Sequence, residues 1–166
     1  GNRQNASVYN LDGLYKTYSR AIRQYPLAGP TKFQQILTES INQAKSCKIS
    51  GEMVYQILLI LTDGAIHDMA DSIDLLVQGS YLPLSVIIVG VGKDDFSLME
   101  QLDSDEELLV DGQGNKAQRD MVQFVPFRET AQDIHKLRKE VLAELPDQLV
   151  AYYKHSGITP SQRIQQ

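Results

Sequence analysis

The sequence predicts an α/β fold built on a parallel sheet, and two apolar runs with a helical stretch between them support this prediction. Residues 55–64 read YQILLILTDG, a run too continuous for a half-exposed strand, and residues 84–92 read LSVIIVGVG. The runs are about 20 to 30 residues apart, as expected for parallel strands joined by a crossover helix. The crossover has apolar residues at helical spacing: Ile66, Met69, Ile73, Leu76 and Val77. Ligands bind beyond the carboxyl ends of such strands, so Asp63 is the first candidate for chemistry.

A first helix is expected before these strands. Apolar residues recur at helical spacing over residues 11–25. Asn10 or Asp12 is placed to cap the start of this helix, and Pro26 ends it.

A second amphipathic helix is expected after the loop LAGPTKF, with an apolar stripe over residues 33–44. Thr31 lies just before this helix, and its structural interpretation is an N-cap whose hydroxyl accepts a free backbone N–H. Cys47 is interpreted as a half-buried helix residue, because free cysteine usually behaves as a small hydrophobe.

Pro83 marks the turn into the second strand, and a short helix is predicted over residues 96–102. Residues 103–120 form an acidic insertion in which residues 111–114, Asp-Gly-Gln-Gly, predict a tight turn. The segment MVQFVPF, residues 121–127, follows as a third strand that its proline confines to the strand end.

The last predicted element is a helical stretch over residues 131–157, in which Pro146 either kinks the helix or starts a new segment. Residues 158–166 are expected to be a flexible polar tail. No repeat or linker divides residues 1–166, so one domain is expected.

Composition limits the function classes. The chain has 166 residues and a formal charge of -5, with 16 Lys and Arg scattered among 21 Asp and Glu. This balance argues against nucleic acid as a partner. The single cysteine, Cys47, excludes an internal disulfide and fits a reducing compartment. No window approaches the roughly 18 consecutive apolar residues of a membrane span, so a soluble chain is expected.

Several familiar motifs fail on inspection. Residues 90–92, Gly-Val-Gly, resemble a dinucleotide fingerprint, but Asp95 occupies the third glycine position and would repel a pyrophosphate. The acidic run from Asp103 has Leu108 where a calcium-binding EF-hand loop needs glycine. No G-x-S-x-G elbow occurs, and the histidines lack paired metal-ligand spacing. His67 could form a hydrogen bond near Asp63, although a surface helix histidine is the favoured interpretation.

A metal site with oxygen ligands at a strand end remains as a possibility. The Thr31 hydroxyl and the Asp63 carboxylate are hard oxygen donors, which Mg²⁺ prefers along with several waters. Two residues do not define a site. The alternative for Asp63 is a turn residue that caps the following helix.

Five segments, taken in order, resemble one family: GPTKF at 29–33, LLILTDGAIHD at 58–68, LPLSVIIVGVG at 82–92, DMVQFVPFRE at 120–129 and VLAELPDQL at 141–149. Together they resemble the C-terminal von Willebrand A domain of copines over nearly the whole chain. The VQFVPF and AELPDQL segments are specific, whereas many A domains share the TDG loop. Plant ubiquitin ligases that pair a copine-type A domain with a RING finger have a similar LAGPT loop and form the nearest competing group.

The resemblance implies a three-layer, doubly wound (Rossmann-like) sheet with a metal-ion-dependent adhesion site on its carboxyl edge. Thr31 is similar to the threonine of the second metal loop, and Asp63 is similar to the aspartate of the third. With first-loop oxygens and waters, they would hold Mg²⁺ or Mn²⁺, with Ca²⁺ as an alternative. An open coordination position would accept a carboxylate from a partner protein.

The sequence departs from the family pattern at its start. Copines have an Asp-Phe-Thr-x-Ser-Asn type segment as the first metal loop, and no aspartate here begins such a pattern. Residues 10–13 resemble the start of the helix before the threonine loop. We therefore expect residues 1–166 to be the C-terminal part of an A domain, with about three strands and an incomplete metal site. The first part would be missing through cleavage, disorder or separation into another chain, and strand 55–61 would expose an apolar edge.

The function that the resemblance implies is a non-enzymatic protein-protein interaction module of a copine-like calcium-dependent phospholipid-binding protein. It would recruit intracellular proteins, and phospholipid binding would belong to C2 domains outside this chain. We expect a cytoplasmic protein with peripheral membrane recruitment at full length. One alternative is the substrate-docking A domain of a RING-type ubiquitin ligase. A less favoured one is a hydrolase that uses Asp63 as a metal ligand or general base.

Overall fold

A computed structural model describes residues 7–51, 53–103 and 107–158. The predicted tail beyond Ile158 and part of the acidic run after Asp103 lie outside these ranges. The chain divides into two compact units, residues 1–30 and residues 31–166.

The first unit contains helix α1 (Asn10–Gln24). The Asn10 side-chain oxygen accepts the backbone N–H groups of Asp12 at 3.0 Å and Gly13 at 3.2 Å, which is the capping role predicted for it. The helix ends one residue before the Tyr25-Pro26 pair. None of its residues is buried, although its apolar stripe is continuous.

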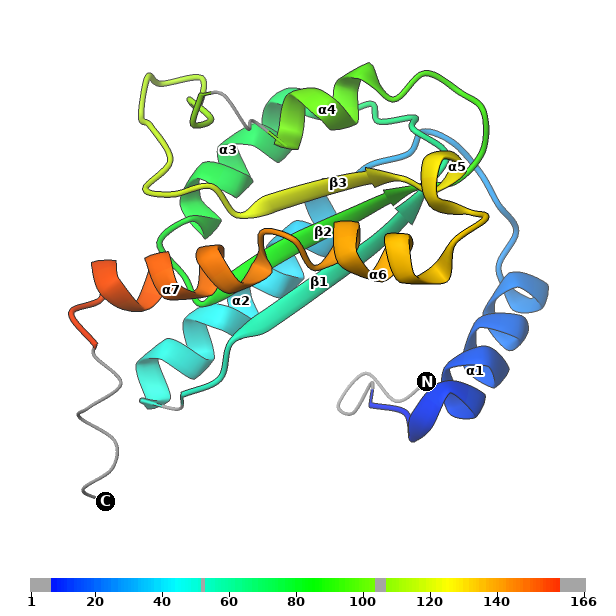
Figure 1. Cartoon of the computed structure of the whole chain (residues 1–166), viewed down its shortest axis with the longest axis horizontal. Coiled ribbons are helices and arrows are strands. Elements are labelled where there is room, and N and C mark those ends of the chain that lie inside the picture. Colours follow the sequence, from blue (N-terminus) through cyan, green and yellow to red (C-terminus); the bar gives the residue numbers. More distant parts are fainter. Residues whose placement is uncertain (1–6, 52, 104–106, 159–166) are drawn as a thin grey trace. The chain divides into compact units, whose positions relative to one another are not determined.

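The second unit is built on a three-stranded parallel sheet (Figure 1). Its strands, in spatial order, are β1 (Gln56–Thr62), β2 (Leu84–Gly90) and β3 (Val122–Pro126). Thr62 pairs with Gly90, and Gly90 pairs with Pro126, so the three carboxyl ends are level at one edge of the sheet. The predicted parallel β-α-β unit and third strand are confirmed.

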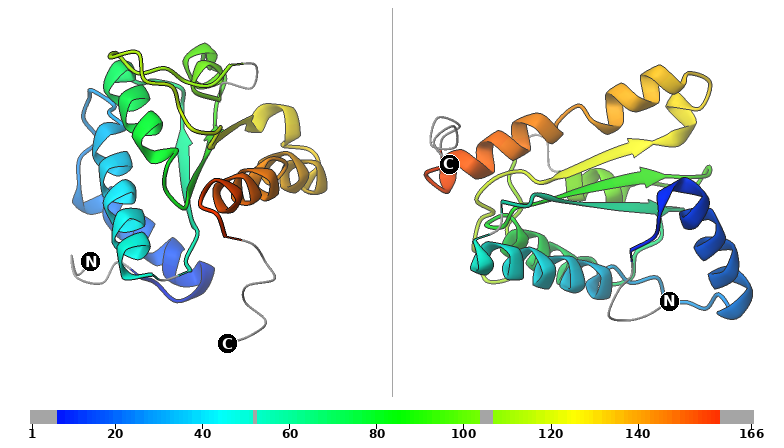
Figure 2. Two further views of the ribbon diagram at one scale, coloured as in Figure 1. Left: turned by 90° about the vertical axis from the view of Figure 1, so that its left-hand side faces the viewer. Right: turned by 90° about the horizontal axis from the view of Figure 1, so that it is seen from below.

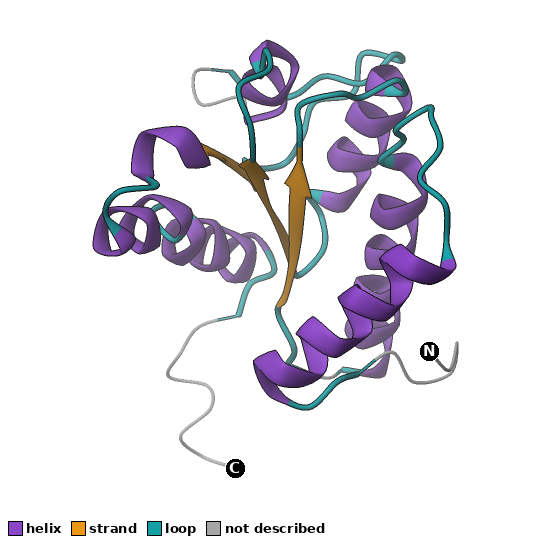
Figure 3. Cartoon of the chain, turned by 90° about the vertical axis from the view of Figure 1, so that its right-hand side faces the viewer, coloured by secondary structure: helices purple, strands orange, loops and turns teal. Residues whose placement is uncertain are grey.

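Helices cover both faces of this sheet, which confirms the three-layer α/β prediction (Figures 2 and 3). One face is covered by α2 (Gln34–Ser50), α3 (Met69–Gly79) and α4 (Ser97–Asp103). The other face is covered by α6 (Ile134–Val141) and α7 (Leu145–His155), which follow the short α5 (Phe127–Thr130).

The main core lies between the sheet and the α2–α3–α4 layer. Every residue of β2 is buried, as expected for a central strand with helices on both faces. The largest fully buried side chains of this core are Leu37, Leu76, Leu84, Ile88, Met99 and Leu102. Cys47 is half-buried on α2, as predicted.

Two local predictions about turns and helix starts can be compared with the structure. Pro146 lies in the first turn of α7, where its missing N–H costs nothing, so it starts a new helix, one of the two predicted outcomes. The Asp111 turn is also confirmed: the Asp111 carboxylate accepts the N–H groups of Gln113 at 2.9 Å and Asn115 at 2.7 Å.

Candidate functional site

The loop after β1 presents Asp63 to solvent. Thr62, the last strand residue, is buried, and its hydroxyl accepts the Gly64 N–H at 3.2 Å. The Asp63 carboxylate accepts the Ala65 N–H through Oδ1 at 3.2 Å, a local turn contact. Within the described residues, Oδ2 of Asp63 has no hydrogen-bond partner, so this oxygen is available to a ligand.

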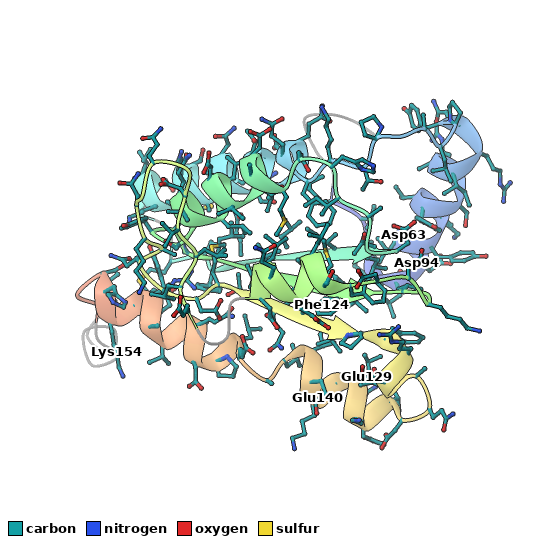
Figure 4. All side chains as sticks on the ribbon, turned by 90° about the horizontal axis from the view of Figure 1, so that it is seen from above. Asp63, Asp94, Phe124, Glu129, Glu140 and Lys154 are labelled. Atoms are coloured by element: carbon teal, nitrogen blue, oxygen red, sulfur yellow. The ribbon has the colours of Figure 1, made fainter. Side chains whose placement is uncertain are left out.

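Gly64 fixes this loop against the neighbouring one. Its φ is +104°, and a Cβ added there would lie 2.8 Å from the Asp95 carbonyl oxygen and 2.9 Å from the Phe96 ring. Only glycine fits this conformation and this space. The loops after β1 and β2 are therefore in direct contact, and Figure 4 places Asp63 and Asp94 at the same end of the sheet.

Thr31 lies in the loop before α2 and is tied to the loop after β1. The His67 N–H donates to the Thr31 carbonyl oxygen at 2.9 Å, and the Thr31 N–H donates to His67 Nδ1 at 3.2 Å. The Thr31 side chain is exposed, and its hydroxyl forms no hydrogen bond in the part of the chain that the structure describes. These contacts bring the segments of both predicted ligands together at the carboxyl edge.

Two structural interpretations from the sequence are wrong here. Thr31 does not cap α2, because that helix begins later, with Phe33 at its N-cap position and no side-chain cap from it. The cap comes from Asp68, which accepts the N–H of Phe33 at 3.0 Å and of Gln34 at 2.8 Å. His67 is not a helix residue either, since α3 begins at Met69.

A third loop at this edge of the sheet follows β2 and contains Asp94 and Asp95. The Asp95 carboxylate accepts the Ser97 N–H at 3.0 Å and the Ser97 hydroxyl at 2.9 Å, and these two hydrogen bonds lower the pKa of Asp95. Its oxygens are therefore engaged within the loop. Asp94 has no such contact within the described residues, and it lies next to the loop that bears Asp63.

The donor set fits a hard cation in chemistry but is small. A threonine hydroxyl and a carboxylate oxygen, both exposed, are ligands that Mg²⁺ and Mn²⁺ accept. Among the described residues, no group of three or more His, Cys, Asp or Glu side chains could hold a metal. A cation at Thr31 and Asp63 would therefore need waters and oxygens from elsewhere to fill its coordination sphere.

A polar cluster at the opposite end of the sheet is structural. Arg119 is 4% exposed, and its guanidinium donates to the carbonyl oxygens of Leu82 at 2.9 Å and Leu84 at 2.6 Å. Gln148 Nε2 donates to the Asp120 carboxylate at 2.8 Å, and burial raises the pKa of Asp120. Arg119 Nε is buried and has no hydrogen-bond partner among the described residues, but the other contacts join Arg119 to the start of β2 and α7 to Asp120, shortly before β3.

The outer edge of β1 is apolar. Ile57, Leu59 and Leu61 are 51%, 55% and 67% exposed, and no strand pairs with this edge among the residues that the structure describes. Beside it, an apolar groove of about 470 Å³ lies between the sheet and α6. The expected exposed edge is therefore present.

None of the helices in the described ranges is long and apolar enough to cross a membrane.

Comparison with known proteins identifies the family. The family model described as Copine matches residues 1–161. Copine-C of Dictyostelium discoideum is 44% identical over 155 residues, which cover 93% of this chain and 29% of that protein. The chain thus spans less than a third of the length of this relative. The open parallel sheet with helices on both faces is consistent with the A-domain architecture that the sequence implied. The chain belongs to the copine family.

Proposed function

We propose that this chain is a non-enzymatic protein-interaction module in which Thr31 and Asp63 contribute ligands to a divalent-cation site. The observation that supports this most strongly is the pair of hydrogen bonds between Thr31 and His67, which joins the threonine loop to the aspartate loop. Both oxygen donors therefore lie at the carboxyl edge of one sheet, where ligands of α/β folds bind.

Bound Mg²⁺ or Mn²⁺ would act as an electrophilic centre that accepts a carboxylate from a partner protein. The role of this chain's residues is to present oxygens and to exclude competing contacts. The Asp63 turn keeps Oδ1 on the Ala65 N–H and leaves Oδ2 for the cation. In a complete copine-like protein, such a module would recruit partner proteins to membranes, and phospholipid binding would belong to C2 domains elsewhere.

Calorimetric titration of Mn²⁺ into the wild-type chain and into three variants tests the ligand set. Asp63→Ala removes the carboxylate, Thr31→Val removes the hydroxyl at constant shape, and Thr31→Ser restores a hydroxyl. We expect Asp63→Ala and Thr31→Val to bind Mn²⁺ at least about tenfold more weakly than the wild type. A tenfold change in the dissociation constant equals about 1.4 kcal/mol of binding free energy, which is within the range of one charged contact. Thr31→Ser should bind like the wild type.

Asp147→Ala is the matched control for general charge, because Asp147 is an exposed aspartate on α7. Its Mn²⁺ affinity should equal that of the wild type. Equal heats for the wild type and Asp63→Ala would remove Asp63 from the ligand set, and no heat for the wild type would remove the metal site from this chain.

The partner chemistry has its own test. A short peptide with one glutamate should bind in the presence of Mn²⁺ and be released by a chelator, whereas the same peptide with glutamine should not bind. Equal binding of both peptides would exclude recognition through a carboxylate.

A further inference from the structure

Asp68 is a buried carboxylate that joins two segments far apart in the chain. It is 8% exposed and precedes α3, yet its oxygens accept the N–H groups of Phe33 and Gln34 at the start of α2. A carboxylate on the free N–H groups of a helix start is stabilised by hydrogen bonding and by the helix dipole. Asp68 therefore caps a helix that begins 34 residues before it.

His67 adds a second pair of contacts to the same place. Its N–H donates to the Thr31 carbonyl oxygen at 2.9 Å, and its Nδ1 lies 3.2 Å from the Thr31 nitrogen. The dipeptide 67–68 thus forms four hydrogen bonds to residues 31–34. We call these four bonds the inter-loop contact. None of them uses the Thr31 hydroxyl or the Asp63 carboxylate.

The loop between Asp63 and Asp68 is fixed at both ends. Next to Asp63, Gly64 packs against the Asp95 carbonyl oxygen and the Phe96 ring. In its middle, Ile66 is 8% exposed and belongs to the core. At its far end stands the inter-loop contact. A shift of residues 31–34 relative to this loop would therefore change the separation between the Thr31 and Asp63 oxygens.

We propose that Asp68 is a positioning residue that sets this separation, a role that rests on the proposed metal site. It touches no ligand in this arrangement and acts through the backbone of residues 31–34. Residues that orient metal ligands without contacting the metal themselves typically contribute about 10- to 100-fold to metal affinity. Aspartate suits the position because each carboxylate oxygen accepts one N–H group, whereas asparagine supplies only one acceptor oxygen.

The experiment compares Asp68→Ala and Asp68→Asn with Asp133→Ala in the full chain. Asp133 is the matched control, because its carboxylate caps α6 by accepting the N–H groups of His135 at 2.8 Å and Lys136 at 3.2 Å. Loss of either cap should cost about 1 kcal/mol of stability. Of these two aspartates, however, only Asp68 joins the Thr31 loop to the loop that bears Asp63. Asp68→Asn keeps one acceptor and guards against an alanine variant that does not fold.

Two readouts separate positioning from capping. The first is hydrogen exchange of the Thr31 and His67 amides in the absence of metal. Both Asp68 variants should accelerate it at least tenfold, and Asp133→Ala should leave it unchanged. The second is Mn²⁺ affinity, which should fall about 10- to 100-fold in Asp68→Ala and stay at the wild-type value in Asp133→Ala.

Unchanged exchange of Thr31 and His67 in Asp68→Ala would overturn the inference, since Asp68 would then only cap α2. Unchanged Mn²⁺ affinity beside accelerated exchange would also overturn it, because the separation would not depend on Asp68. A wild-type chain that binds no Mn²⁺ overturns the proposed function instead. In that case the exchange measurement still decides whether Asp68 holds the Thr31 loop.

Discussion

Gly90 and Gly92 are required at the end of β2 for two different physical reasons. A Cβ on Gly90 would lie 2.7 Å from Phe96 and 3.0 Å from Phe124, whose rings pack 5.5 Å apart. Gly92 has open space around it but a φ of +121°. Ring packing and backbone conformation thus account for the Gly-Val-Gly sequence without a nucleotide.

Gly90→Ala should therefore destabilise the domain. An added methyl group in a packed core costs about 1 to 3 kcal/mol, because the rings must move. Gly112→Ala is the control, since its added Cβ would lie an ordinary 3.7 Å from its nearest neighbour, a carboxylate oxygen of Asp74. Urea unfolding should show a change within about 0.5 kcal/mol for Gly112→Ala. Equal midpoints for the two variants would contradict the packing argument.

Asp120 should make stability depend on pH. Burial raises its pKa in the folded protein above the unfolded value, so folding favours the protonated carboxyl. Its contribution is therefore greatest below the unfolded pKa and is lost as pH rises through the folded pKa. Asp120→Asn cannot titrate, and its remaining side-chain oxygen can still accept the Val122 N–H.

The measurement is the free energy of unfolding of the wild type and Asp120→Asn from pH 7 down to about pH 4, near the ordinary carboxyl pKa. The wild type should gain stability relative to the variant as pH falls, because only the wild type takes up the proton. A wild type that loses stability relative to the variant over this range would show that the pKa of Asp120 is lowered.

Sequence reasoning could single out Asp63 and Thr31 as candidates, but it could not predict the residues that connect their two loops. Asp63 follows an apolar run, and a strand end is visible in the sequence. The contacts of His67 and Asp68 reach 34 to 36 residues back along the chain, and no local pattern encodes them. The available signal was an aspartate placed before the crossover helix, which also suits a local cap.

At the scale of elements, the strands were predictable because each is a nearly continuous run of apolar residues in the sequence. Residues 84–90 are all buried, and the apolar run gave the correct strand. The short α5 was not predicted, because it follows Pro126 directly and buries only Thr130. Periodicity needs more than one turn to be recognised.

The alternation along β1 gives a prediction for this element. Ile60 is 6% exposed and faces the main core, whereas Leu59 is 55% exposed on the opposite face. Ile60→Ala should cost about 2 to 5 kcal/mol, the range for buried aliphatic truncations. Leu59→Ala should cost less than about 1 kcal/mol in this chain. Chemical denaturation measures both, and equal costs would mean that the outer face of β1 is covered.

At the scale of the whole molecule, β1 lacks features that usually protect the edge strands of soluble proteins. Natural edge strands carry charges, prolines or bulges that prevent further pairing. The edge from Gln56 to Thr62 has none of these charges or prolines, and its exposed residues are Ile57, Leu59 and Leu61. If residues 1–166 are the C-terminal part of an A domain, as the resemblance of the sequence implies, a strand from the rest of that domain would pair with β1.

This expectation predicts that one substitution changes the free energy of unfolding by different amounts in this chain and in the longer protein. Leu59→Ala should cost less than about 1 kcal/mol in the 166-residue chain. In the longer protein, the same change should cost about 2 to 5 kcal/mol, because the rest of the A domain would bury the leucine. Ile60→Ala is the internal control, since its core environment is already complete here and its cost should be the same in both contexts. A Leu59→Ala cost that stays small in the longer protein would show that β1 remains an open edge there.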